Sequence, residues 1–239
     1  VSKIIAGRII PATLEIMDKT TINCVEDFAK IGLPREMEAL LLIEVDGHPA
    51  VVAEEVAGVR KVLEQVKAAE IRQAANAEEA LQLAAARRTS LSAVARVSPT
   101  TILEDATVPR SRLAETFAEI ERLKKKYGIQ VATYGHAGDG NLHPTAVTDE
   151  RNPLELEKVH AFFSELYEKV LSLGGTVSGE HGIGIAKKGY LLRQFGQGGM
   201  EVMRRIKKGF DPDGRLNPGK IFLEDGISTG VKVPGGAHV

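Results

Sequence analysis

Two glycine-rich stretches of this chain contain residue types that often carry chemistry. Residues 134–144 read Tyr-Gly-His-Ala-Gly-Asp-Gly-Asn-Leu-His-Pro, with His136 and His143 on either side of the central glycines. Residues 178–184 read Ser-Gly-Glu-His-Gly-Ile-Gly, with Glu180 next to a histidine. Glycine permits sharp bends and lets the backbone approach a small ligand closely. We interpret the two stretches as the halves of one metal and substrate site.

His136, His143 and Glu180 form a candidate set of metal ligands. If the first stretch folds back on itself, both imidazoles reach one ion, and Glu180 supplies the third ligand. Two imidazoles and one carboxylate bind divalent metals and leave coordination positions open. Zinc, manganese and ferrous iron all suit this set, so the ligands do not identify the metal. The alternative interpretation is that one or both histidines only satisfy the backbone of a turn.

His181 is assigned a separate role, as a catalytic base. Neighbouring side chains in extended backbone point to opposite sides, so we expect His181 not to share the ion with Glu180. A neutral imidazole can take a proton from an alcohol held at a metal, because the metal lowers the pKa of that alcohol. In the alternative interpretation His181 is an exposed turn residue.

Arg87 and Arg88 end an alanine-rich helix that the sequence predicts over residues 77–89. One cation at this position complements the helix dipole. The other could bind a substrate carboxylate, because a guanidinium group offers paired donors. Other polar residues receive supporting or surface roles: Asn141 and Asp139 orient the first stretch, and His48, His160 and His238 are surface or cap residues.

The elements expected to position these residues alternate along the chain. A strand over 129–133 leads into the first stretch, a strand containing Val147 leaves it, and a short strand over 176–178 leads into the second. A helix over 153–173 shows an apolar stripe at helical spacing. The remaining expected elements are extended chain over 4–18, helices over 22–31, 50–68 and 111–126, strands over 38–46, 71–75 and 100–108, and short helices over 187–195 and 199–209.

This order indicates an α+β fold, because the long, evenly apolar strands of a doubly wound parallel sheet are missing. We expect an antiparallel sheet with helices on one face, in a ferredoxin-like and duplicated arrangement. The sequence contains neither a glycine-rich dinucleotide motif after the first strand nor a phosphate-loop motif. We expect residues 1–225 to form the domain and residues 226–239 to be a flexible tail.

The composition excludes several classes of protein. The chain has 239 residues, enough for a packed core, and its net charge of -1 creates no broad field for nucleic acid or an anionic membrane. Its one cysteine, Cys24, suits a reducing compartment, and no apolar run approaches the roughly 20 residues of a membrane span. We expect a cytoplasmic protein that reaches a membrane only through partner subunits. Val1 in place of methionine suggests a fragment of a longer protein.

Three motifs in this order resemble a known family. They are Gly-His-Ala-Gly-Asp-Gly-Asn-Leu-His-Pro at 135–144, Ser-Gly-Glu-His-Gly-Ile-Gly at 178–184 and Leu-Asn-Pro-Gly-Lys at 216–220. Together they resemble the C-terminal half of the FAD-linked oxidases of the vanillyl-alcohol oxidase type. Within that family the likeness is to members of the glycolate oxidase and D-lactate dehydrogenase type, and it extends from about residue 4 to residue 223.

The resemblance implies a substrate or cap domain whose N-terminal FAD-binding domain is absent from this chain. It assigns roles to seven residues: a divalent metal held by His136, His143 and Glu180, a base at His181, a substrate-carboxylate arginine at Arg87, and a segment returning to the flavin at Asn217 and Lys220. The implied reaction is oxidation of a small 2-hydroxy acid with hydride transfer to the flavin. The implied partners are an FAD-binding domain, in cis or in trans, and an iron-sulfur subunit.

Two departures from the family pattern lie near Arg87. Ala84 replaces a tryptophan, and Leu91-Ser92-Ala93 replaces Phe-Pro-Ala. Two other classes of function also remain open. The chain could be a stand-alone metal-binding or regulatory module without redox activity, or a metal-dependent hydrolase in which His181 or Glu180 activates water.

Overall fold

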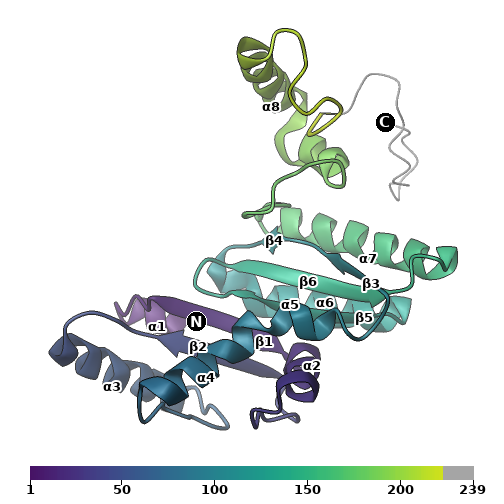
Figure 1. Cartoon of the computed structure of the whole chain (residues 1–239). Coiled ribbons are helices and arrows are strands. Elements are labelled where there is room, and N and C mark those ends of the chain that lie inside the picture. Colours follow the sequence, from purple (N-terminus) through teal and green to yellow (C-terminus); the bar gives the residue numbers. More distant parts are fainter. Residues whose placement is uncertain (223–239) are drawn as a thin grey trace.

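The computed structural model describes residues 1–222, so the tail expected over 226–239 lies outside the described residues. Its centre is a six-stranded antiparallel sheet in the order β2-β1-β5-β6-β3, with β4 also paired to β6 (Figure 1). An α+β fold with an antiparallel sheet is therefore confirmed. The strands are β1 (Thr13–Asp18), β2 (Ala39–Glu44), β3 (Thr100–Leu103), β4 (Ala106–Thr107), β5 (Gln130–His136) and β6 (Asn141–Thr148).

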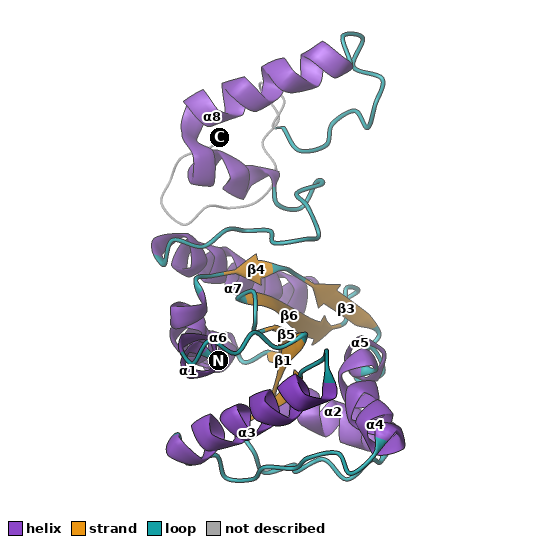
Figure 2. Cartoon of the chain, turned by 90° about the vertical axis from the view of Figure 1, so that its left-hand side faces the viewer, coloured by secondary structure: helices purple, strands orange, loops and turns teal. Residues whose placement is uncertain are grey.

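Helices precede, connect and follow these strands (Figure 2). Most of the long helices appear where the apolar spacing predicts them. The helices are α1 (Ser2–Ala6), α2 (Lys19–Ala29), α3 (Pro49–Gln65), α4 (Ala77–Arg88), α5 (Ser90–Val94), a 3-10 turn η1 (Arg110–Arg112), α6 (Leu113–Tyr127), α7 (Pro153–Ser172) and α8 (Lys188–Phe210).

Helices cover both faces of the sheet, so the expectation of a single covered face is wrong. Val131 and Ala132 are consecutive on β5 and point to opposite faces, and each belongs to a different hydrophobic cluster. The Val131 cluster contains Ile120 of α6 and Phe162 of α7, whereas the Ala132 cluster contains Val25 of α2. Consecutive buried residues along a strand are the mark of a sheet covered on both sides. The ferredoxin-like duplication stays a prediction.

Side-chain caps explain where several helices begin. Asp18 Oδ1 accepts the backbone N–H of Thr21 at 2.7 Å and starts α2. Asn152 caps α7, and a proline follows it at the first helical position, where the missing N–H costs nothing. His48 caps α3, as expected of this histidine. His160 is exposed on α7, as expected, and His238 lies outside the described residues.

Some local predictions were wrong. Residues 2–6 form α1, not extended chain, and residues 71–75 form no strand. The strand expected over 38–46 does form, as β2, but it was expected to be buried and is instead an edge strand with partly buried or exposed residues. The strand expected over 100–108 is divided into β3 and β4 by Glu104 and Asp105. Strand propensity reflects the packing surface more than the backbone, so short β-branched runs do not fix these boundaries.

The last helix, α8, extends away from the sheet (Figure 1). Its two segments meet at Gly196, whose φ of 63° and ψ of 178° are not helical. This break agrees with the two short helices expected over 187–195 and 199–209. Across residues 1–222, we find no helix with the length and apolar character that a bilayer crossing requires.

Candidate metal and active site

The central hairpin brings His136 and His143 together. In the β5–β6 register Tyr134 is opposite His143, and His136 is opposite Asn141. Residues two apart on a strand share a face, so the two histidines are diagonal neighbours across the hairpin. Their ring centroids are 5.3 Å apart. Only residues 137–140 form a turn, so most of the first motif is strand and not an open loop.

Gly140 is the residue that closes this turn. Its φ of 76° is a left-handed value, and a Cβ there would collide with the carbonyl oxygen of Val108. The backbone N–H of Val108 donates to the carbonyl oxygen of Gly140 at 3.0 Å. The glycine therefore lets the hairpin end approach the chain after β4. In the same turn, the backbone N–H of Asp139 donates to the carbonyl oxygen of His136 at 3.0 Å.

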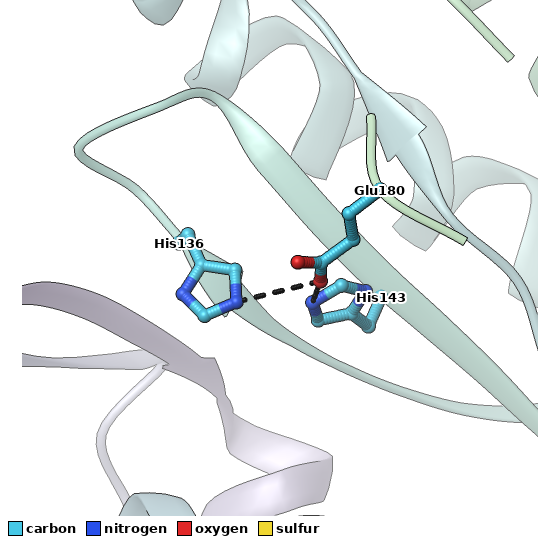
Figure 3. Close-up of side chains that lie close together, drawn as sticks. All are labelled: His136, His143 and Glu180. Atoms are coloured by element: carbon cyan, nitrogen blue, oxygen red, sulfur yellow. Dashed lines mark ion pairs between the residues drawn. The ribbon is translucent and has the colours of Figure 1, made fainter. Parts of the chain in front are cut away.

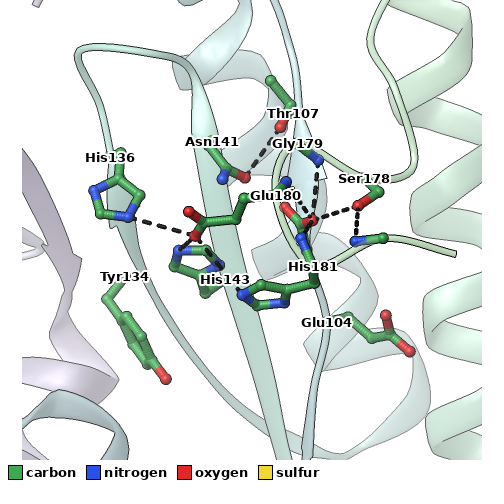
Figure 4. Close-up of polar contacts among 12 residues, drawn as sticks. Glu104, Thr107, Tyr134, His136, Asn141, His143, Ser178, Gly179, Glu180 and His181 are labelled. Atoms are coloured by element: carbon green, nitrogen blue, oxygen red, sulfur yellow. Dashed lines mark hydrogen bonds and ion pairs between the residues drawn. The ribbon is translucent and has the colours of Figure 1, made fainter. Parts of the chain in front are cut away.

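One buried carboxylate, Asp105, holds the second motif, whose residues Ser178 to His181 are seen beside the central hairpin in Figure 4. Its Oδ2 accepts hydrogen bonds from the Ser178 hydroxyl at 2.7 Å and from the backbone N–H groups of Gly179, Glu180 and His181 at 2.9, 3.0 and 2.8 Å. Burial raises the pKa of Asp105, but these donors outweigh burial and lower the pKa to about 2. The ionised carboxylate therefore fixes the backbone on both sides of Glu180.

Gly179 is packed against Thr107 and Asn141, whose side-chain oxygens are 3.0 Å apart in a hydrogen bond. A Cβ at position 179 would collide with Thr107 Oγ1 and stand 2.9 Å from Asn141 Cγ. Asn141 thereby links the hairpin to the second motif, and its expected role in orienting the first motif stays a prediction.

We expect Gly179→Ala to lower the free energy of unfolding by roughly 1–3 kcal/mol, because the added methyl group overpacks this contact. Gly198→Ala in α8 is the matched control, since a Cβ there meets nothing within 4 Å. The control should be neutral or slightly stabilising, because alanine has the higher helix propensity. Urea denaturation of both variants measures the difference, and equal stability would contradict the close packing at Gly179.

The side chains of His136, His143 and Glu180 converge on one point (Figure 3). Their candidate ligand atoms all lie within 4.8 Å of one another. Glu180 Oε1 is 3.1 Å from His143 Nε2 and 3.5 Å from His136 Nε2. The donors are two imidazole nitrogens and one carboxylate oxygen, which fits a divalent metal with open coordination positions. The exposed fraction of the Glu180 side chain is 48%, so the point is accessible to a ligand.

His143 is the buried member of the three. The pKa of His143 is lowered to about 4. Burial is the main cause, and the nearby His181, His136 and Arg87 contribute to the same shift. The imidazole is therefore neutral at physiological pH, which is the form that binds a metal. Its ring lies 5.8 Å from the ring of Tyr134, the residue opposite it in the β5–β6 register.

His181 lies on the same side as the three candidate ligands, contrary to the sequence-based expectation. Its ring stacks on that of His143, with centroids 4.9 Å apart and planes at 10°. His181 Nε2 is 3.7 Å from Glu180 Oε1. The chain bends at 179–181 around Asp105, so the extended backbone assumed for this argument does not occur. The His181 side chain is 35% exposed, so it can contact a molecule bound where His136, His143 and Glu180 converge.

Arg87, and not Arg88, faces this site. Arg87 Nε donates to Glu15 Oε2 at 2.7 Å, and its guanidinium carbon lies 4.9 Å from the centroid of the Tyr134 ring. Arg88 instead approaches the carbonyl oxygen of Leu81 in its own helix. Both arginines lie in the last turn of α4, where a cation complements the helix dipole, and Arg87 keeps its place beside the site despite the departures at Ala84 and at 91–93.

Sequence reasoning missed two residues of this site, Glu15 and Asp105. Glu15 also accepts a hydrogen bond from His136 Nδ1 at 2.7 Å. A signal was available, because Glu15 is a charged residue between two apolar ones on a strand, where a buried charge needs a partner. Asp105 interrupts a β-branched run, but its four donors come from a segment far away in the sequence.

Asn217 and Lys220 are not among the residues that surround the candidate ligands. The segment that carries them follows α8 and folds back on the start of that helix. The backbone N–H of Ile221 donates to the carbonyl oxygen of Gly184 at 2.7 Å, and Lys188 Nζ donates to that of Gly219 at 3.1 Å. The expected flavin contacts of Asn217 and Lys220 stay a prediction.

Comparison of the sequence with known proteins gives consistent matches. Residues 1–221 match the family of FAD linked oxidases, C-terminal domain. The chain is 49% identical over 225 residues to the glycolate oxidase subunit GlcD of Bacillus subtilis (strain 168), covering 94% of this chain and 48% of that protein. It is 33% identical over 221 residues to the D-lactate dehydrogenase of Anaerostipes hadrus, covering 88% of this chain and 46% of that protein. The chain thus spans about half the length of these relatives.

Solved structures show a similar fold. The 4-ethylphenol oxidase from Gulosibacter chungangensis matches 88% of this chain and 47% of its own with a TM-score of 0.60 and 16% identity. P-cresol methylhydroxylase matches 89% of this chain and 47% of its own with a TM-score of 0.54 and 14% identity. At such identities the likeness concerns the fold alone. The sequence matches carry the assignment: this chain belongs to the family of FAD linked oxidases and corresponds to its C-terminal domain.

Proposed function

We propose that this chain is the substrate-binding and catalytic half of an FAD-dependent 2-hydroxy-acid dehydrogenase or oxidase of glycolate or D-lactate type. The observation that carries the proposal is the convergence of His136, His143 and Glu180, with His181 and Arg87 beside them. The printed names of the relatives support the substrate class, since two of them are a glycolate oxidase subunit and a D-lactate dehydrogenase. The domain would be the substrate or cap domain, with a duplicated ferredoxin-like sheet.

The three candidate ligands would hold a divalent metal: zinc, manganese or ferrous iron. When bound, the metal supplies a Lewis acid for the substrate hydroxyl, and the FAD of a partner domain supplies the acceptor for hydride. Arg87 binds the substrate carboxylate through its two Nη atoms. His181 takes the hydroxyl proton on a ring nitrogen. Removal of this proton and of the C2 hydride leaves a 2-oxo acid, which balances the two-electron oxidation.

The flavin would come from another domain, in cis or in trans. Exposed apolar side chains often mark a surface that another domain or protein covers. Such side chains on α8 and directly after it support the partner domain, and they are Phe195, Val202, Ile206, Phe210 and Leu216. The segment with Asn217 and Lys220, which we propose returns to the flavin, follows these residues directly in the chain. An iron-sulfur subunit, and a cytoplasmic location with membrane contact only through partners, complete the proposal.

The test compares this chain with the longer protein that contains a flavin domain. We expect the 239-residue chain alone to show no flavin absorbance and no dye reduction with glycolate or D-lactate. With the flavin domain present, one of these acids should reduce the flavin. His181→Ala should then lower kcat by roughly 10²–10⁴, the usual contribution of a general base. His160→Ala is the control, because this exposed histidine of α7 lies outside the site.

Three results would contradict the proposal. Turnover of a 2-hydroxy acid by the 239-residue chain without added flavin domain would show that it is not half of the catalytic unit. Hydrolysis of an ester or amide by that chain, lost in His181→Ala, would instead favour a metal-dependent hydrolase. A chain that binds metal but supports no flavin reduction by these acids, even with the flavin domain present, would favour a regulatory module.

A further inference from the structure

We propose that Glu15 is a positioning residue that couples the candidate metal ligand His136 to the candidate substrate-binding Arg87. This inference rests on the proposed function for the roles of those two residues. Glu15 itself would touch neither metal nor substrate. It would act by fixing the orientation of both groups with one carboxylate.

The geometry makes Glu15 a bridge between the two. Its Oε1 is 2.7 Å from His136 Nδ1, and its Oε2 is 2.7 Å from Arg87 Nε. Glu15 lies directly opposite His136 in the β1–β5 register, so the sheet itself brings the two side chains together. The side chains of Glu15 and Arg87 are only 13% and 17% exposed. A charge-assisted contact that is shielded from water holds its geometry better than an exposed one.

The first consequence concerns the tautomer of His136. An ionised carboxylate only accepts hydrogen bonds, so Glu15 requires the proton of the neutral ring to sit on Nδ1. The lone pair is then on Nε2, the atom that faces Glu180 Oε1 at 3.5 Å. Carboxylates that hold the second nitrogen of a histidine in this way orient the ring and raise its basicity as a ligand.

The second consequence concerns the direction of Arg87. Glu15 occupies Nε, and the guanidinium group lies over the Tyr134 ring. Within residues 1–222, neither Nη of Arg87 donates a hydrogen bond. The two Nη atoms are the pair that could bind a carboxylate in a bidentate manner. Glu15 thus determines which nitrogen of His136 can bind the metal and in which direction the Arg87 guanidinium points. It thereby fixes the distance between the proposed metal ligand and the proposed carboxylate-binding group.

A purely structural role would be an ion pair that ties α4 to β1. That role predicts lower stability in Glu15 variants, with no change in the His136 ring or in metal affinity. The positioning role predicts changes in both. The two can therefore be separated by measurements made on the chain without any turnover.

The experiment uses Glu15→Gln, with Glu119→Gln as matched control. Glu119 is 17% exposed and pairs with Arg122 on α6, away from the site. The amide oxygen of glutamine can accept a hydrogen bond from either His136 or Arg87. Its amide N–H₂ group only donates, so it cannot accept the second hydrogen bond. The ¹⁵N NMR signals of the histidine rings report the His136 tautomer in the metal-free chain, at a pH above the ordinary pKa of histidine. Calorimetric titration with Zn²⁺ reports the metal affinity.

We expect Glu15→Gln to move the His136 proton partly to Nε2 and to raise the Kd for Zn²⁺ roughly 10–100-fold, the usual effect of losing such a partner. Glu119→Gln should leave both unchanged. If Glu15→Gln does not fold, Glu15→Asp keeps the charge but is one methylene too short to bridge, and the same changes are expected. An unaltered tautomer together with an unaltered Kd in a folded Glu15 variant would overturn the proposal.

The outcome is separable from that of the proposed function. If the protein with the flavin domain oxidises no 2-hydroxy acid, the proposed function is wrong. A tautomer shift in the metal-free Glu15 variant would still support the positioning role of Glu15. Conversely, an active protein whose Glu15 variants keep the tautomer and the Kd would retain the proposed function and lose the bridge.

Discussion

We expect the chain with His143 replaced by alanine to bind no divalent metal under conditions in which the unaltered chain should bind about one ion per molecule. His143 is expected to have the largest effect of the three candidate ligands, because it is buried, neutral and 3.1 Å from Glu180 Oε1. Removing its imidazole leaves one histidine and one carboxylate, too few protein ligands for a typical zinc site. Elemental analysis of purified protein after dialysis measures the metal content.

Since His143 is 4% exposed, its replacement could also disturb packing, so a second variant is needed. Glu180→Gln changes a half-exposed side chain and keeps its volume. It should lower the metal affinity strongly while leaving the thermal unfolding temperature close to that of the unaltered chain. His160→Ala removes an exposed histidine of α7 and should bind metal normally. Equal metal content in the His143, Glu180 and His160 variants would refute the ligand assignment.

Replacing Asp105 with alanine should lower the free energy of unfolding by roughly 3–5 kcal/mol. Four donors meet Asp105 Oδ2, and three of them are backbone N–H groups at 179–181. Nearby, Lys187 is 4% exposed and lies 3.9 Å from the same oxygen. The variant leaves these donors without the acceptor, and the second motif loses its anchor. Denaturant titration measures the loss.

Asp213→Ala is the control for this experiment, since its side chain is 66% exposed and forms an ion pair with the exposed Arg215 at 3.3 Å. It should change stability by less than about 0.5 kcal/mol, as is usual for surface positions. Limited proteolysis should cut the Asp105 variant near 178–182 before other sites. A variant as stable as the control would mean that water replaces the carboxylate at no cost.

Acid should remove the same contribution. Folding lowers the pKa of Asp105 to about 2, so the stabilisation is present above the ordinary aspartate pKa and is lost as the pH falls through about 2. The difference in stability between the unaltered chain and Asp105→Asn should therefore narrow between about pH 4 and pH 2. A difference that stays constant over this range would contradict the ionised anchor.

The sequence by itself determined the local features of this protein. Apolar spacing predicted α3, α6 and α7, and alanine-rich composition predicted α4, because these signals act within a few residues of chain. The candidate ligands were recognisable because imidazole and carboxylate groups stood among glycines in short motifs. The order of those motifs also indicated the family that the matches over residues 1–221 establish.

Only the tertiary structure decided how these pieces meet. The β5–β6 register made His136 and His143 diagonal neighbours, and the bend around Asp105 turned His181 toward them. Glu15 joined His136 and Arg87 through a pairing of β1 with β5 that links residues more than a hundred positions apart. Helices on both faces of the sheet followed from the same long-range packing. A sequence pattern has a period but no register, and these contacts depend on register.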